Sequence, residues 1–186
     1  YNYRELRAEL EAVGVHFRTS SDTEVLIAAY AQWGEACQER FNGMWAFVIW
    51  DREAQRLFCS RDRFGIKPLY WLLCHNQLYL ASEPKQLRAL GFGAQVDPEE
   101  LSRFLYAGIV GSTQSTFFAD IQSLPPGHSL SVDSCGHPRI IPWYSLAPRR
   151  ADPAEISTLL RDSVALRLRS DCLLYTSPSP RDQRGS

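Results

Sequence analysis

The alternation of apolar and polar residues is lost in two short stretches of the chain, Met44–Trp50 and Leu69–Cys74. Both are strand-length runs that are apolar almost throughout, whereas an antiparallel strand with one wet face alternates. A continuous apolar strand is therefore expected to have both faces covered. One arrangement that covers them stacks two antiparallel sheets and caps each outer face with helices. The pattern thus predicts an α+β fold, a four-layer αββα sandwich.

Three strands are predicted within the segment Arg56–Ser82: Arg56–Ser60, Pro68–Cys74 and Leu78–Ser82. A turn at Arg63–Lys67 joins the first two, and a shorter one at His75–Gln77 joins the second and third. Short connections of this kind favour antiparallel pairing.

The rest of the chain shows mainly helical spacing. Helices are expected over Tyr3–Val13, Glu24–Trp33, Glu83–Leu90, Pro98–Ala107 and Glu155–Leu168. Short strands are expected over His16–Thr19, Met44–Asp51, Ser129–Val132 and Pro138–Tyr144. Asn2 is a candidate cap of the first helix. The last helix is expected to turn its apolar face inward, with Ile156, Leu159, Leu160, Val164 and Leu168.

Changes in composition divide the chain into four parts. Residues 1–95 are expected to form a compact domain, residues 96–152 its remainder and a connection, and residues 153–171 the first helix of a second domain. Residues 172–186 have no periodicity and contain two Ser-Pro pairs. They fit either a native disordered tail or foreign sequence, and the abrupt change after a helix favours foreign sequence.

Composition narrows the function classes. The formal net charge is −1 and no basic stretch is present, which argues against nucleic acid or an anionic membrane as a partner. The apolar runs fall far short of the roughly 20 residues of a membrane helix. Five widely spaced cysteines without a C-x-x-C pair favour reduced thiols in a cytoplasmic protein, with neither a disulfide framework nor a metal site.

Seven motifs occur in one order along the chain: YNYRELRAEL, SDTE, FNGMWAFVIWD, RDRFGIKPLY, ASEPKQL, VDPEEL and LPPGH. Together they resemble the glutaminase half of glutamine-dependent asparagine synthetases, which are class II (Ntn-type) amidotransferases. The resemblance runs from Tyr1 to about Asp171. It implies the same αββα sandwich that the apolar pattern predicts.

The resemblance implies that the catalytic groups precede Tyr1. In the family an N-terminal Cys attacks the glutamine amide, its own α-amino group acts as base, and an Asn-Gly pair holds the oxyanion. None of the five cysteines matches that nucleophile, and Asn42–Gly43 matches a second Asn-Gly that is expected to form a turn. Cys59 and Cys74 lie in apolar strands, where a thiol pKa is expected to rise. The chain by itself is therefore expected to be inactive, with no catalytic residue.

Asp22 is the substrate contact that the resemblance carries over. It matches the Asp that pairs with the α-ammonium of L-glutamine in the family. Spacing alone favours a different role for Asp22, as a cap of the helix Glu24–Trp33, which is very common for Asp. The flanking motifs favour the ligand contact.

A second group of family-signature residues is interpreted as structural: Arg61, Asp62, Gly65 and Pro68. An Arg-Asp pair at a strand end, followed by a Gly, suits a fixed turn. Glu83 and Lys85 fit an ion pair or a solvated helix start equally well. His128 has no visible carboxylate partner in sequence, and no catalytic role is expected for it.

The resemblance also implies a second domain that binds ATP and Mg²⁺ and activates aspartate. The match ends at Cys172, before the ATP loop, so no cofactor is expected to bind this chain. A homodimer is left open. Alternative hypotheses are another class II amidotransferase acting on a different acceptor, a non-catalytic module that binds glutamine or a partner, and a purely structural domain.

Overall fold

A computed structural model describes residues 2–111, 114–133, 136–148, 150 and 152–168. Seven strands form two sheets in this part of the chain. The four-stranded sheet has the order β1-β2-β6-β7 and the three-stranded sheet the order β4-β3-β5, and every neighbouring pair is antiparallel. The strands are β1 Ala46–Asp51, β2 Arg56–Arg61, β3 Tyr70–Cys74, β4 Gln77–Ala81, β5 Gln122–Ser123, β6 His128–Val132 and β7 Pro138–Pro142.

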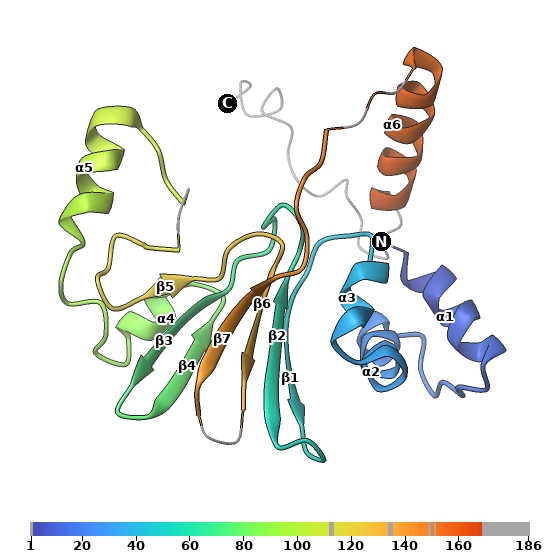
Figure 1. The fold of residues 1–186 in the computed structure, drawn as a ribbon, viewed down its shortest axis with the longest axis horizontal. Coiled ribbons are helices and arrows are strands. Elements are labelled where there is room, and N and C mark those ends of the chain that lie inside the picture. The colour runs from blue at the N-terminus through green and yellow to red at the C-terminus, as the bar shows by residue number, and fades with distance from the viewer. Residues whose placement is uncertain (1, 112–113, 134–135, 149, 151, 169–186) are drawn as a thin grey trace, which may run out of the picture.

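Helices α1, α2 and α3 lie on the side of the four-stranded sheet and α4 and α5 on the side of the three-stranded sheet, whereas α6 lies away from both sheets (Figure 1). Their bounds are α1 Tyr3–Ala12, α2 Asp22–Trp33, the 3₁₀ turn η1 Gly34–Ala36, α3 Cys37–Arg40, α4 Pro84–Arg88, α5 Pro98–Ala107 and α6 Pro153–Arg167. The expected α+β sandwich of two antiparallel sheets with flanking helices is confirmed.

Three apolar clusters fill the three interfaces of this stack. Leu10 and Val25 pack with Trp45 between the first helices and the four-stranded sheet. The second cluster lies between the sheets, where Cys59 and Leu130 meet Leu69 and Trp71. The third, with Leu72, Ala81, Leu87 and Ile121, covers the outer face of the three-stranded sheet. Strand β3 contributes Trp71 to the second cluster and Leu72 to the third, so both of its faces are covered at these two residues, whereas Leu73 is 44% exposed.

Strand β1 is less completely covered than its composition predicts. Phe47 packs toward the helices and Ala46 toward the second sheet. Val48 and Trp50, farther along the strand, are 43% and 53% exposed. The expectation that both faces of this strand are covered therefore holds only for its first half.

The expected pairing between the first two strands of the central segment is wrong. β2 pairs with β1 and β6, whereas β3 pairs with β4 and β5 in the other sheet. The turn between them is not a hairpin but a corner that carries the chain from one sheet to the next. Residues 75 and 76 do form the predicted hairpin between β3 and β4, and both have positive φ, as a tight two-residue turn requires.

A buried carboxylate fixes this corner, residues 62–67. Asp62 is 1% exposed, and its oxygens accept the backbone N–H groups of four residues at 2.9–3.2 Å: Trp45, Phe64, Ile66 and Lys67. Burying a charge costs several kcal/mol unless hydrogen bonds replace water. Four charge-assisted bonds, each with a net worth of about 1.5–3 kcal/mol, offset that cost.

The two arginines beside Asp62 tie the corner to neighbouring layers. Arg61 donates to the carbonyls of Gly65, Lys67 and Leu124 and to Ser123 Oγ, which joins it to β5. Burial lowers the pKa of the Arg61 guanidinium. Arg63 donates to the carbonyls of Glu39 and Phe41 at the end of α3 and lies over the rings of Trp143 and Tyr144.

Gly65 sits where a side chain would not fit. Its φ is +65°, and a Cβ built on it would meet Pro126 Cγ at 2.8 Å. The corner therefore needs the missing side chain as well as the left-handed backbone.

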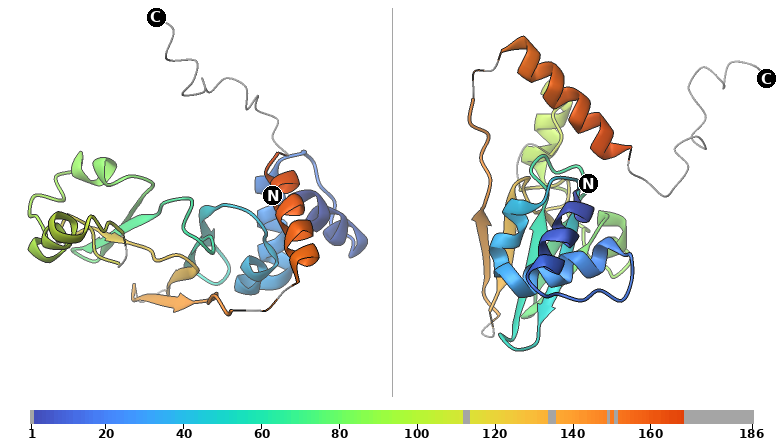
Figure 2. Two further views of the ribbon diagram at one scale, coloured as in Figure 1. Left: turned by 90° about the horizontal axis from the view of Figure 1, so that it is seen from above. Right: turned by 90° about the vertical axis from the view of Figure 1, so that its right-hand side faces the viewer.

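Two further expectations are wrong. Residues 16–19 form no strand, because the carboxylate of Glu24 accepts the N–H groups of Arg18 and Thr19, which a strand partner would otherwise use. In α6 and at its C-cap Leu168, the five apolar side chains expected to face inward are 51–65% exposed. This helix stands apart from both sheets (Figure 2), so no core of the described residues covers its apolar face. The segment 172–186 lies outside the described residues.

The helix boundaries otherwise agree with expectation to within a few residues. Asn2 does not cap α1 with its side chain. Its side chain instead donates to the Arg40 carbonyl and accepts the Asn42 N–H, which ties the start of α1 to the turn before β1. No described helix is both long and apolar enough to cross a membrane.

Replacing Asp62 by Asn tests the corner. The amide keeps one acceptor oxygen and turns an NH₂ group toward backbone donors, so we expect Asp62→Asn to lower the free energy of unfolding by about 2–4 kcal/mol. Urea unfolding followed by tryptophan fluorescence measures this change. The control Asp133→Asn replaces an exposed carboxylate whose oxygen accepts the turn N–H of His137 at 3.2 Å, and as a surface substitution it should change stability by less than about 0.5 kcal/mol. Equal effects of the two substitutions would contradict the role of Asp62.

Candidate functional site

A cavity of about 490 Å³ opens between α2, β1 and the corner. Asp22, Thr23, Leu26 and Ile27 line it from the first half of α2, and Met44–Ile49 line it from β1 and the residues before it. Lys67 and Pro68 close it from the corner, and Ser82 closes it from the end of β4. The cavity thus has one carboxylate, one ammonium, two hydroxyls and a long apolar wall.

The carboxylate of Asp22 is in the first turn of α2, and the helix begins two residues earlier than expected. Ser21, not Asp22, is the N-cap, because its side chain accepts the Thr23 N–H at 3.2 Å. The capping role that spacing alone allowed for Asp22 is therefore taken by its neighbour. Asp22 is exposed and lines the cavity, and its carboxylate is approached by the Thr23 hydroxyl at 3.4 Å.

The family-signature residues divide into two groups. Pro68 reaches the cavity wall together with Asp22. Arg61, Asp62 and Gly65 lie behind that wall, where their bonds hold the corner itself. Contacts within the corner are what a structural role of Arg61, Asp62 and Gly65 requires.

Lys67 is a charged lining residue that the sequence analysis did not assign to the site. Its backbone N–H is bound by Asp62 and its carbonyl by Arg61, so the corner fixes its position while its side chain stays exposed. Its position directly before Pro68 in the RDRFGIKPLY motif is the sequence feature that could have indicated a place in the site. Because Lys67 and Asp22 come from opposite walls, the cavity offers both signs of charge to a small zwitterion.

The remaining candidates lie away from the cavity. Glu83 and Lys85 do form an ion pair, at 2.6 Å, but both side chains are more than half exposed, so the pair adds little stability. His128 Nδ1 lies 2.7 Å from the Pro126 carbonyl. Asn42 lies in the irregular segment before β1, where its backbone bonds to Asn2. No group of three or more described His, Cys, Asp or Glu side chains is arranged to hold a metal ion.

The described cysteines are free thiols. Burial raises the pKa of Cys37 and of Cys59 to about 12, which confirms the expectation for Cys59. Cys74 is half-buried at the end of β3, with its Sγ 3.3 Å from His75 Nδ1. None of the three lines the cavity, so its described lining can bind a ligand but offers no thiol nucleophile.

Comparison with solved structures identifies the fold class. The chain superimposes on glutamine phosphoribosylpyrophosphate amidotransferase from B. subtilis, complexed with ADP and GMP, with a TM-score of 0.56 and 22% identity. The match covers 80% of this chain and 28% of that one. At this identity the likeness establishes the fold alone, a sandwich of two antiparallel sheets with flanking helices.

A family model then defines the protein class. The model of the glutamine amidotransferase domain matches residues 1–144, so the chain belongs to the glutamine amidotransferase domain family. The resemblance inferred from the seven motifs is confirmed by curated relatives as well as by this match.

Curated relatives include asparagine synthetases. Asparagine synthetase [glutamine-hydrolyzing] 1 of Bacillus subtilis (strain 168) is 36% identical over 177 residues, which cover 92% of this chain and 28% of the relative. Asparagine synthetase [glutamine-hydrolyzing] 3 of the same organism is 33% identical over 182 residues, with 95% and 30% covered. The chain therefore spans less than a third of the length of these relatives.

Alkylation tests the burial of the two core thiols. With a pKa of about 12 instead of 9.0, each has a thiolate fraction at pH 8 of about one in ten thousand, where an unperturbed thiol has about one in ten. We expect Cys37 and Cys59 to stay unmodified by iodoacetamide in the folded protein and to react once urea unfolds it, as read by peptide mass spectrometry. Rapid labelling of either in the folded state would show that the stack is open.

Proposed function

We propose that this chain forms the glutamine-binding part of the glutaminase half of a glutamine-hydrolysing asparagine synthetase. The observation that carries the proposal is the position of Asp22 on the wall of the 490 Å³ cavity, with the helix cap supplied by Ser21. A carboxylate that is not needed to cap its helix is available to a ligand. Two asparagine synthetases are 36% and 33% identical to this chain over 92% and 95% of its length, and this similarity supports the choice of reaction.

Asp22 would pair with the α-ammonium of L-glutamine as a charge-assisted hydrogen-bond acceptor. The apolar side chains of Leu26 and Met44 would face the methylene groups of the substrate. The described lining has no thiol, so the nucleophilic Cys, its α-amino base and the oxyanion hole would come from sequence that precedes this chain in the complete protein. The chain alone would then be inactive.

The released ammonia would attack aspartate that the rest of the complete protein has activated with ATP. ATP and Mg²⁺ would bind there and not to the described residues. Free thiols at Cys37, Cys59 and Cys74 fit a reducing compartment, and we place the reaction in the cytoplasm.

A second candidate is an amidotransferase with a different acceptor. Amidase chry2 of Gibberella zeae is 36% identical over 130 residues, which cover 70% of this chain. Relatives named for another activity thus share this part of the sequence. The described cavity would bind glutamine in either case, and assays of the complete protein with aspartate separate the two.

The complete protein, expressed from the whole reading frame, allows a direct test of Asp22. Removing the charge in Asp22→Asn deprives the substrate ammonium of its partner, so we expect the KM for glutamine to rise at least about tenfold while kcat changes less. Steady-state release of glutamate measures both constants. Asparagine formation supplied with ammonium salt instead of glutamine bypasses the cavity and should be unchanged.

Asp133→Asn, at the β6–β7 turn, is the matched control and should leave the KM as it is. An unchanged KM in Asp22→Asn would rule out the proposed contact. A non-catalytic module is distinguished by the absence of any glutamate release from the complete wild-type protein.

A further inference from the structure

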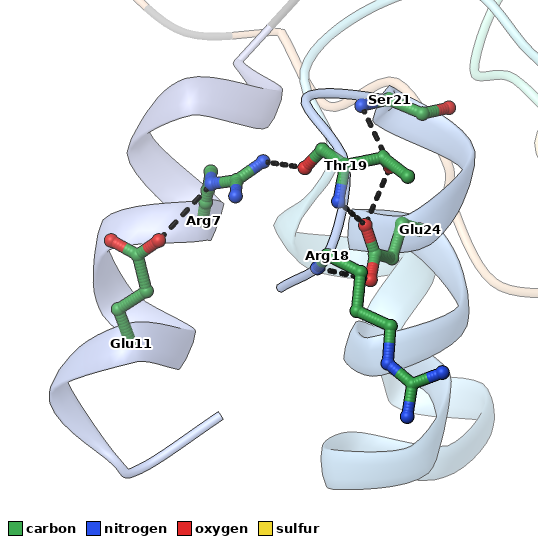
Figure 3. Close-up of polar contacts among 6 residues, drawn as sticks. All are labelled: Arg7, Glu11, Arg18, Thr19, Ser21 and Glu24. Carbon is green, nitrogen blue, oxygen red and sulfur yellow. Dashed lines mark hydrogen bonds and ion pairs between the residues drawn. The ribbon is translucent and has the colours of Figure 1, made fainter. Parts of the chain in front are cut away.

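The chain that leads into Asp22 is held by the carboxylate of Glu24. This side chain, in the first turn of α2, reaches back and accepts the N–H of Arg18 at 2.8 Å, the N–H of Thr19 at 2.8 Å and the Thr19 hydroxyl at 2.6 Å (Figure 3). Three bonds from two consecutive residues fix the direction of the backbone just before the helix. These bonds lower the pKa of the Glu24 carboxyl, with the Thr19 hydroxyl as the largest cause, so the group is ionised at neutral pH.

Arg7 holds the same loop from the neighbouring helix. Its Nη1 donates to the Thr19 carbonyl at 2.6 Å and its Nε to Glu11 at 3.1 Å (Figure 3). Its guanidinium carbon lies 4.5 Å from the centre of the Phe17 ring, also in the loop. The N–H, hydroxyl and carbonyl of Thr19 are therefore all engaged, and its hydroxyl oxygen also accepts the Ser21 N–H at 3.2 Å.

This network surrounds the start of α2 without using Asp22. Ser21 caps the helix and Glu24 holds the residues before it, whereas the carboxylate between them is exposed at the cavity. A carboxylate on a loosely held helix start would sample several positions, and each would have to be restricted when a substrate binds. A helix start that is already fixed avoids this loss of conformational entropy on binding.

We propose that Glu24, Thr19 and Arg7 form a positioning unit that holds the Asp22 carboxylate ready for the ammonium group of the substrate. This inference rests on the proposed function, because it assigns the unit a role in glutamine binding. The unit does not touch the substrate; it acts through Asp22. A purely structural role would instead make the same bonds serve only the stability of the loop.

Two ligands distinguish these roles in the complete protein. One is L-glutamine, and the other is 4-carbamoylbutanoate, which lacks the α-amino group and is tested as a competitive inhibitor. We expect Glu24→Gln to raise the KM for glutamine about five- to tenfold, because the substitution removes one or two oriented hydrogen bonds. The Ki of the analogue should change less than about twofold, because Asp22 has no ammonium to pair with there.

The double variant adds a second criterion. If Glu24 acts through Asp22, Asp22→Asn combined with Glu24→Gln should have the same KM as Asp22→Asn alone, since coupled residues are not additive. Glu9→Gln is the matched control, because it removes an exposed α1 carboxylate that pairs with Arg40 and does not touch the loop. Its KM should equal that of the wild type.

Thr19 provides a pair of variants that preserves the shape of the loop. Thr19→Val removes the hydroxyl and should raise the KM for glutamine, whereas Thr19→Ser keeps it and should restore the wild-type value. This pair tests the proposal even if Glu24→Gln does not fold.

The outcomes separate this inference from the proposed function. An effect of Asp22→Asn together with no effect of Glu24→Gln and Thr19→Val would overturn the positioning unit alone. Equal changes for glutamine and the analogue would overturn it too, in favour of a structural role. No effect of Asp22→Asn would overturn both.

Discussion

The hydrogen bonds between the buried Asp62 carboxylate and four backbone N–H groups are the contact on which the rest of the fold depends. They convert a connection short enough for a hairpin into a corner between two sheets. One of the four donors, Trp45, precedes β1, so the same carboxylate also sets where the edge strand begins. Arg61 and Arg63 extend the corner to β5 and to α3. A single charged segment thus fixes the spacing of three layers.

Two carboxylates, those of Asp62 and Glu24, position the two walls of the cavity in the same way. Asp62 holds the corner and thereby places Lys67 and Pro68, and Glu24 holds the loop before α2 and thereby places Asp22. In both cases the two oxygens of a carboxylate accept backbone N–H groups, which leaves a neighbouring side chain to face the cavity. The site is therefore built from rigid loops, as a binding site for a small polar molecule requires.

The sequence predicted the layers and most elements because they follow from local period and from apolar runs. It did not predict features that depend on distant hydrogen bonds. Residues 16–19 looked like a strand, but the N–H groups of Arg18 and Thr19 bond to a side chain and not to another strand. The predicted turn at Arg63–Lys67 looked like a hairpin turn, since loop length alone does not reveal which sheet follows.

The candidate site was predicted in part. The family motif pointed to Asp22, and the cavity at that residue supports the choice. The spacing Ser21-x-x-Glu24 is that of a capping box and could have indicated that Ser21 is the cap. That Glu24 would reach past the cap to residues 18 and 19 depends on how α1 and its Arg7 pack, which periodicity does not contain.

Hydrogen exchange of individual backbone amides in the wild-type protein tests the corner most directly. The account predicts that the amides of Phe64, Ile66 and Lys67, although they lie in a loop, are protected to nearly the same degree as those of β2, because their acceptor is a buried charge. Exchange of these three amides at the rate of an exposed loop would contradict it.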